Sequence, residues 1–229
     1  GRSAQGSGTA LGRRSALRPV RALVTGAAGF LGSTLAEELR RQGFEVRGAD
    51  AFTVNYDPGR KRANLGGLLR DPGFQLVEAD LRTAALEPLL EGVSHVVHLA
   101  ALPGVRPSWG ESFRAYAEHN ILVTQRLLEA MRVGIIERIV VASSSSVYGA
   151  PTRLPTPEEE PARPISPYGV TKLATEALVH AYRHERGVPA VALRYFTVYG
   201  PRQRPDMGFH RFFEAARRGG PVTVYGDGR

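Results

Sequence analysis

Short apolar runs alternate with longer amphipathic stretches from residue 20 onward. Each run has the length of a strand and is followed by residues that favour turns. The run 93–100 is apolar on both faces, as expected for a central strand of a parallel sheet. The predicted strands are Val20–Thr25, Phe44–Asp50, Phe74–Ala79, Val93–Ala100, Ile135–Ser143 and Val188–Tyr195.

Helical periodicity fills the intervals between these strands. Leu31, Leu35 and Leu39 recur on one helix face, and Gly43 ends that helix. Because strands alternate with helices, the sequence predicts an α/β fold with a doubly wound, mostly parallel sheet. The other predicted helices are Lys61–Leu69, Ser112–Arg132 and Pro167–Arg186, and 151–164 is predicted as a surface loop.

The composition is that of a globular protein with an unusual N-terminal segment. The 229 residues are 42% hydrophobic, and the net charge is +8. Residues 1–21 hold five arginines and no acid, so most of the excess charge is local and nucleic-acid binding is not expected. We interpret 1–19 as a flexible tail or cloning remnant, with a mitochondrial presequence as the alternative.

Two classes of protein are disfavoured by residue usage. No apolar run is long enough for a membrane span, so no membrane partner is expected. The chain has no cysteine, which excludes disulfides and cysteine-ligated zinc and is compatible with a reducing cytoplasm. No metal site is predicted.

A glycine-rich turn lies between the first strand and the first helix. In 25–32, TGAAGFLG, the glycines are spaced three residues apart. Gly26 permits a tight turn, Gly29 lets the backbone approach a pyrophosphate, and Gly32 lets the helix pack on the strand. The helix N-terminus then offers N–H groups to phosphates. A purely structural turn is the alternative, but the strand–turn–helix context favours a dinucleotide site in a Rossmann fold.

Asp50 ends the second predicted strand. A carboxylate at this position can accept hydrogen bonds from the adenosine ribose and repels a 2′-phosphate, which favours NAD over NADP. A turn residue without a ligand is the alternative. Three cationic residues follow in the sequence, and they keep NADP open as an alternative cofactor: Arg60, Lys61 and Arg62.

Tyr168 and Lys172 lie one helical turn apart on a predicted helix. A lysine ammonium near a tyrosine lowers the pKa of the phenol, and a tyrosine shifted toward neutrality can remove a proton from a sugar hydroxyl. Ser144 follows the fifth predicted strand, at the sheet edge where such folds bind ligands. A half-buried Tyr with an extended Lys, and a polar loop at Ser144, are the alternatives.

Together these pieces resemble the NAD-dependent epimerase/dehydratase family of extended short-chain dehydrogenases. The resemblance covers nearly everything after residue 19, in the family's order. The matching segments are TGAAGFLG (25–32), Asp80-Leu81, HLAA (98–101), Asn120, SSSSVYG (143–149), YGVTK (168–172) and LRYFTVYGPRQRPDM (193–207).

The resemblance implies tightly held NAD⁺, a nucleotide-diphosphate sugar as substrate, and a homodimer in the cytoplasm. It implies that Tyr168 is the base, that Lys172 holds the nicotinamide ribose and that Ser144 is the matching hydroxyl. Asp80 is expected to reach the adenine. The other positions that it assigns to the cofactor are Phe30, Leu31, Leu81, Leu99, Ala100, Ala101 and Asn120.

Two departures from the family pattern set the expected boundaries. Thr197 stands where many members have Asn, and the sequence stops where members continue. We therefore expect an NAD-binding domain with the catalytic residues over 20–200. Residues 201–229 are expected to begin a smaller, incomplete sugar-nucleotide-binding region with no obvious finishing element.

The side chains after the catalytic serine favour 4-epimerisation. The family's 4,6-dehydratases carry Asp-Glu at the positions of Ser145 and Ser146, and decarboxylases of UDP-glucuronate usually have Glu at the second. Serines are poor acids and bases at neutral pH. Dehydratase and decarboxylase activities therefore remain as alternatives, as does a non-catalytic dinucleotide sensor, although such relatives often lose the Tyr, Lys or Ser.

The substrate is expected to be UDP-glucuronate, with UDP-glucose and UDP-N-acetylglucosamine as rivals. Arg106 and Thr197 lie in segments that look most like UDP-glucuronate 4-epimerases, and with Ser144, Ser145 and Ser146 they are candidate substrate contacts. Arg204 is predicted to bind the sugar carboxylate through a two-point grip. The alternative is that Arg202 and Arg204 meet only the diphosphate or the protein surface.

Overall fold

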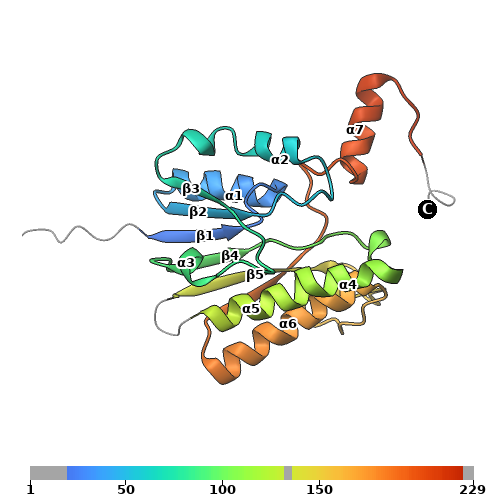
Figure 1. Cartoon of the computed structure of the whole chain (residues 1–229). Helices are drawn as coiled ribbons and strands as arrows, with labels where there is room; N and C mark the ends of the chain where they lie inside the picture. The colour runs from blue at the N-terminus through green and yellow to red at the C-terminus, as the bar shows by residue number, and fades with distance from the viewer. Residues whose placement is uncertain (1–19, 132–135, 224–229) are drawn as a thin grey trace, which may run out of the picture.

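The computed structural model describes residues 20–131 and 136–223 (Figure 1). The expected tail 1–19, the end of one predicted helix at Arg132, the start of a predicted strand at Ile135 and the last residues 224–229 lie outside the described residues. No helix of the described ranges is long and apolar enough to cross a lipid bilayer.

Six parallel strands form one sheet in the order β3-β2-β1-β4-β5-β6. The order reverses between β1 and β4, which confirms the predicted doubly wound fold. The strands are β1 (Arg21–Thr25), β2 (Glu45–Asp50), β3 (Phe74–Glu78), β4 (His95–His98), β5 (Arg138–Ser144) and β6 (Ala190–Tyr195).

Helix α1 packs on one face of the sheet, and α5 and α6 pack on the opposite face (Figure 1). The helices are α1 (Phe30–Arg41), α2 (Pro58–Asn64), α3 (Glu87–Leu90), α4 (Phe113–Tyr116), α5 (Val123–Ala130), α6 (Pro167–Arg186) and α7 (Gly208–Arg218). The shorter turns are η1 (Leu68–Arg70), η2 (Arg106–Ser108), η3 (Gly110–Ser112), the π-helical η4 (Ala117–Leu122) and η5 (Ser145–Val147).

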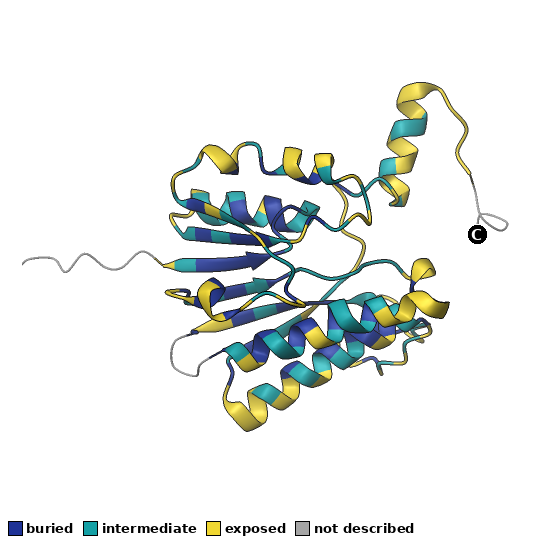
Figure 2. Ribbon diagram, in the orientation of Figure 1, coloured by how far each residue is buried: buried dark blue, intermediate teal, exposed yellow. Residues whose placement is uncertain are grey.

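Hydrophobic strand residues build a core on both faces of the sheet. Leu23 and Val24 are consecutive in β1 and point to opposite faces, yet both are fully buried. Leu23 packs in a cluster with Leu127 of α5 and Val179 of α6, whereas Val24 packs with Ala36 of α1. The strands accordingly form the buried centre of the molecule (Figure 2).

Three helical predictions needed correction. The helix expected over 61–69 is divided into α2 and η1, and α2 begins early because Asp57 caps it by accepting a hydrogen bond from Gly59 N at 2.8 Å. The helix expected over 112–132 contains the π-helical turn η4. Helix α7 forms after residue 200, where the sequence analysis predicted no helix.

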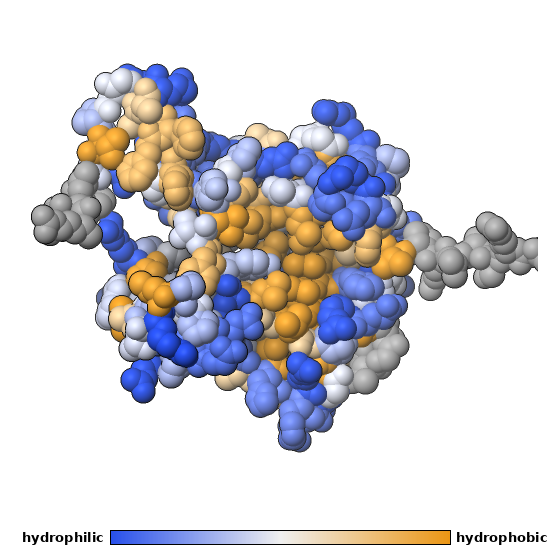
Figure 3. All heavy atoms as spheres, turned by 180° about the vertical axis from the view of Figure 1, so that it is seen from behind, coloured by the Kyte–Doolittle hydropathy of each residue, from blue (hydrophilic) through white to orange (hydrophobic). Residues whose placement is uncertain are grey.

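Helix α7 extends away from the body of the molecule (Figure 1). Its aromatic side chains are exposed, and so are several apolar side chains in and just after β6. From behind, the molecule shows a broad apolar area below this helix (Figure 3). The exposed side chains are Leu193, Phe196, Val198, Tyr199, Phe209, Phe212 and Phe213.

Candidate active site

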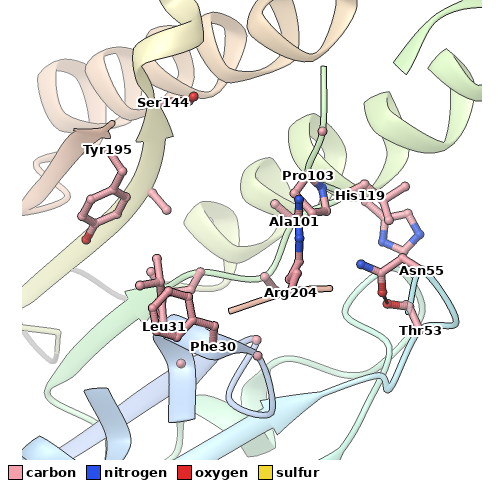
Figure 4. Close-up of a pocket in the computed structure, with 18 of the residues that line it drawn as sticks. Phe30, Leu31, Thr53, Asn55, Ala101, Pro103, His119, Ser144, Tyr195 and Arg204 are labelled. Atoms are coloured by element: carbon pink, nitrogen blue, oxygen red, sulfur yellow. Dashed lines mark hydrogen bonds between the residues drawn. The ribbon is translucent and has the colours of Figure 1, made fainter. Parts of the chain in front are cut away.

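A cavity of about 480 Å³ opens at the carboxyl edge of the sheet, where the strand order reverses (Figure 4). Ligands of doubly wound folds bind at this edge. Residues from β2, β4, β5, β6 and the following loops meet there. The sequence-predicted residues that line it are Gly26, Gly29, Phe30, Leu31, Gly32, Asp50, Asp80, Leu81, Leu99, Ala100, Ala101, Ser144, Ser145, Ser146, Tyr168, Lys172, Thr197 and Arg204.

The glycine-rich turn forms one wall of this cavity. Gly26 has φ +70°, and a Cβ there would lie 2.9 Å from Ala100 N, so the turn approaches the end of β4 too closely for a side chain. A Cβ on Gly32 would lie 2.1 Å from Gly26 O. Gly29 is the N-cap of α1 and has no side-chain capping bond. Its missing Cβ leaves a smooth wall beside a helix N-terminus, which fits a pyrophosphate.

Asp50 holds this turn in place. Its Oδ2 accepts a hydrogen bond from Ala28 N at 3.0 Å, and its Oδ1 accepts one from Phe52 N at 2.8 Å. Each carboxylate oxygen can accept a further bond, so the same group can serve a ribose from the cavity side. Of the neighbouring cations, Arg62 pairs with Glu78 and Lys61 Nζ donates to Thr53 O at 2.6 Å.

The cofactor candidates beyond the turn divide into two groups. Asp80 lines the cavity, and hydrogen bonds from Arg82 hold the pKa of its carboxyl below the ordinary value. Asn120 instead lies buried behind the cavity wall. Its Oδ1 accepts from Leu102 N at 2.8 Å, and its Nδ2 donates to Leu102 O at 3.1 Å and to Thr171 Oγ1 at 3.0 Å. Asn120 therefore positions the wall rather than lining it.

The structure places Tyr168 and Ser144 together. Helix α6 begins at Pro167 because Ser166 caps it, accepting a hydrogen bond from Gly169 N at 3.1 Å. This start sets Tyr168 in the first turn, facing the end of β5. Burial raises the pKa of the Tyr168 phenol, and a hydrogen bond with Ser144 and the charge of Arg204 partly offset that rise.

The Lys172 side chain contacts the backbone of β5. Its Nζ donates to the backbone oxygen of Ala142 at 2.8 Å, and burial lowers the pKa of Lys172 to about 8. The charge that lowers the pKa of Tyr168 in this arrangement is that of Arg204, and an effect of the Lys172 ammonium on this pKa stays a prediction. The contact with β5 sets the direction of the Lys172 side chain.

The two arginines after β6 take opposite directions. Arg202 turns away from the cavity and pairs with Glu37 of α1 at 2.7 Å. Arg204 lines the cavity (Figure 4). Arg106, the other predicted substrate contact, is exposed on η2 and is not among the residues that line the cavity.

Sequence reasoning missed several residues of the cavity wall. Tyr56 is one of them, and its buried hydroxyl has no hydrogen-bond partner within the part of the chain that the structure describes. Burial, reinforced by the nearby charge of Asp50, raises the pKa of Tyr56 to about 12. His119 also lines the cavity. Tyr56 lies in a loop and His119 in the π-helical turn, for which hydrophobic periodicity gives no signal. Lys61, named from the sequence beside Asp50, lines the cavity from α2.

Comparisons with known proteins agree with this geometry. The family model described as "NAD dependent epimerase/dehydratase family" matches residues 22–229. An uncharacterized UDP-glucose epimerase of Bacillus subtilis is 50% identical over 90% of this chain and 66% of its own length. A probable UDP-glucuronate 4-epimerase of Rhizobium meliloti is 38% identical over 92% of this chain and 62% of its own length.

Solved structures show the same likeness. The UDP-glucuronic acid 4-epimerase from Bacillus cereus, in complex with UDP-glucuronic acid and NAD, superimposes with a TM-score of 0.88 at 44% identity. The match covers 91% of this chain and 67% of that one. This chain thus spans less than two thirds of the length of the curated relatives from B. subtilis and R. meliloti. The matched motifs, the fold and these relatives confirm the resemblance, and the chain belongs to the NAD dependent epimerase/dehydratase family.

Proposed function

We propose that this chain carries the cofactor-binding and catalytic part of an NAD-dependent sugar-nucleotide 4-epimerase that interconverts UDP-glucuronate and UDP-galacturonate. The observation that carries the proposal is one cavity lined by Tyr168, Lys172 and Ser144 on one side and by the glycine-rich turn on the other. The proposed domain division, with NAD bound by 20–200 and the sugar nucleotide partly by 201–229, follows from the same arrangement.

NAD is the proposed cofactor. The turn at Gly29 and Gly32 fits a pyrophosphate, and Asp50 fits an adenosine ribose with a free 2′-hydroxyl. The relative from B. cereus was solved with NAD bound. A preference for NADP(H) in the purified protein would contradict the interpretation of Asp50. When bound, NAD⁺ supplies the oxidising equivalent for the sugar C4 carbon.

The chain's own residues move the proton. Tyr168 takes the proton of the sugar 4-hydroxyl, and Ser144 donates a hydrogen bond to the reacting oxygen. Burial raises the pKa of Tyr168, and the Ser144 hydrogen bond and the Arg204 charge oppose that rise, which is the direction that a base requires. Lys172 lies on α6 and its Nζ reaches Ala142 O of β5 in the cavity wall, where it can hold the ligand and orient Tyr168. After the 4-keto sugar has turned over, C4 would regain the hydride on its other face and the oxygen would regain the proton from Tyr168, which gives the epimer.

The cavity contains serines where competing reactions need acids. Ser145 and Ser146 follow Ser144 into the wall, and neither hydroxyl exchanges a proton readily at neutral pH. This favours epimerisation over 4,6-dehydration and over decarboxylation. The retained Tyr, Lys and Ser also argue against a non-catalytic dinucleotide sensor. UDP-glucose remains the second candidate substrate, because the relative from B. subtilis is described as a UDP-glucose epimerase.

Arg204 is the proposed ligand of the glucuronate carboxylate. It is a cavity-lining arginine beyond β6, on the substrate side, and Arg202 is engaged by Glu37. The 4-keto form of glucuronate is a β-keto acid that tends to lose CO₂. An arginine on the carboxylate stabilises the negative charge where it is and so opposes its transfer to the ketone.

The test measures turnover of UDP-glucuronate and UDP-glucose by wild type and Arg204→Ala, together with mass analysis of the nucleotide that is released on denaturation. We expect wild type to use the acid, and Arg204→Ala to lose far more activity with the acid than with the neutral sugar. Equal losses would assign Arg204 to the shared diphosphate, and wild-type turnover of UDP-glucose alone would reject the glucuronate substrate.

The assembly and location of the protein belong to the same proposal. We propose a homodimer in the cytoplasm, supported by the family resemblance and by the lack of cysteine. Light scattering of the purified protein and fractionation of cells would test the two statements separately.

A further inference from the structure

Arg204 owes its position to a loop that is anchored on both sides of it. Arg202 adopts a left-handed backbone with φ +70° and pairs with Glu37 and Ser33 of α1. Gln203 is buried and its Nε2 donates to Val198 O at 2.9 Å. A left-handed conformation is unfavourable for arginine, so these contacts must hold it. The anchors present the next side chain, Arg204, to the cavity.

One edge of the Arg204 guanidinium is already occupied. Its Nε donates to Asp206 Oδ1 at 3.1 Å and its Nη2 donates to Asp206 Oδ2 at 3.0 Å. A two-point ion pair of this kind is planar and fixes the plane of the guanidinium. The remaining donors are the two hydrogens of Nη1 and the second hydrogen of Nη2, and Nη2 also contacts the weak acceptor Met207 Sδ at 3.4 Å.

The ion pair between Arg204 and Asp206 lies where it contributes little to the stability of the fold. The Asp206 side chain is 63% exposed and that of Arg204 is 18% exposed. Ion pairs with a mostly exposed partner add little stability, so holding the chain together does not explain this one. Its geometric effect is specific, because it fixes the free edge of an arginine that lines the cavity.

We propose that Asp206 is a positioning residue that orients Arg204 and thereby determines how an acidic sugar is held. This inference rests on the proposed function. With Asp206 in place, Arg204 offers a single fixed edge to a carboxylate, and the pair is electrically neutral. Without Asp206 the guanidinium keeps its full charge but can rotate.

The consequence for chemistry concerns the 4-keto intermediate. Loss of CO₂ breaks the bond between C5 and the carboxylate carbon. Its electron pair forms a C4–C5 double bond, the charge moves to the C4 oxygen, and the resulting enolate takes a proton from water. A fixed arginine keeps the charge on the carboxylate and holds the breaking bond in one orientation. An arginine that rotates neither keeps the charge on the carboxylate nor holds the breaking bond in one orientation, so a larger share of the intermediate loses CO₂.

The experiment compares wild type, Asp206→Asn and Asp71→Asn with UDP-glucuronate and with UDP-glucose. Asp71 is a matched control, because it pairs with Arg40 through the same two-point geometry far from the cavity. Products are separated and identified by mass. For Asp206→Asn we expect the decarboxylated share of product to rise about tenfold, the effect of losing one charge-assisted contact. The KM for UDP-glucuronate should fall or stay constant while kcat for the epimer decreases.

Each outcome is decisive. Turnover of UDP-glucose should change less than twofold, and Asp71→Asn should give the wild-type product ratio. If wild type epimerises UDP-glucuronate and Asp206→Asn gives the wild-type ratio of products, the role of Asp206 is refuted and the proposed function stands. If wild type does not turn over UDP-glucuronate, the proposed function fails and this inference fails with it. Asp206→Glu, which retains the charge, should restore most of the epimer share.

Discussion

Replacing two glycines of the cofactor turn by alanine, one at a time, should have different effects: one variant should lose stability and the other should lose affinity for NAD. A Cβ at position 32 would lie 2.1 Å from Gly26 O and 2.7 Å from Gly26 C, both backbone atoms that cannot rotate away. A Cβ at position 29 would meet only Gly26 O, at 3.2 Å. Gly29 also has φ −74°, which alanine adopts readily. The absence of a side chain at Gly32 is therefore required for folding, whereas its absence at Gly29 keeps space in the cavity.

The expected sizes follow from these contacts. Gly32→Ala should destabilise the protein by about 3 kcal/mol, the upper range for overpacking of a close contact. For a domain of this size that corresponds to a melting temperature lower by about 6–12 °C. Gly29→Ala should cost only about 1 kcal/mol, the loss of a favourable N-cap residue. Its added methyl group would nevertheless lie against the pyrophosphate and weaken NAD binding by about tenfold or more.

The assay combines thermal unfolding with calorimetric titration of NAD. Gly67→Ala is the control, because Gly67 has helical angles and its nearest atom to an added Cβ, Glu37 Oε1, is 3.8 Å away. That variant should be more stable by about 0.5 kcal/mol and should bind NAD normally. Wild-type NAD affinity in Gly29→Ala would show that the turn does not hold the pyrophosphate. An unchanged melting temperature in Gly32→Ala would refute the packing argument.

Two further predictions follow. Tyr168→Phe should lower turnover by at least about 10²-fold with NAD binding retained, because the general base is lost and the ring is kept. The control Tyr182→Phe, at the other end of α6, should leave turnover unchanged. Near-normal turnover of Tyr168→Phe would contradict the proposed mechanism. Buried His98 lies between two threonine hydroxyls, and burial lowers its pKa to about 3. Unfolded His binds a proton below about pH 6.5, so the free energy of unfolding should fall by about 2 kcal/mol between pH 6.5 and 5. Denaturant unfolding at both pH values should show a smaller fall for His98→Gln, whereas exposed His180→Gln should match wild type.

The sequence by itself determined the architecture. Strand-length apolar runs separated by helical periodicity predict a doubly wound sheet, and a strand such as 21–25, apolar at consecutive positions, must be covered on both faces. The glycine spacing also located the cofactor turn, because Gly26 has φ +70° and a Cβ on Gly32 would meet the backbone of Gly26, two demands that the turn itself creates. Local patterns suffice wherever neighbours in the chain impose the constraint.

Side-chain direction was decided only by the tertiary structure. Arg202 and Arg204 are equivalent in sequence, yet Glu37, far away in the chain, draws the first to α1 and leaves the second in the cavity. The loop that carries Arg204 and Asp206 is likewise anchored by contacts that the sequence does not show, from Arg202 to Glu37 and from Gln203 to Val198.

The same holds for the groups that tune the site. Lys172 Nζ donates to Ala142 O, and Asn120, in the π-helical turn, supports the wall from behind through Leu102. Burial and long-range contacts set both the orientation and the pKa of such groups, and neither quantity is encoded in the spacing of residues along one helix. The sequence determined which residues gather at the sheet edge, and packing decided which atoms face one another there.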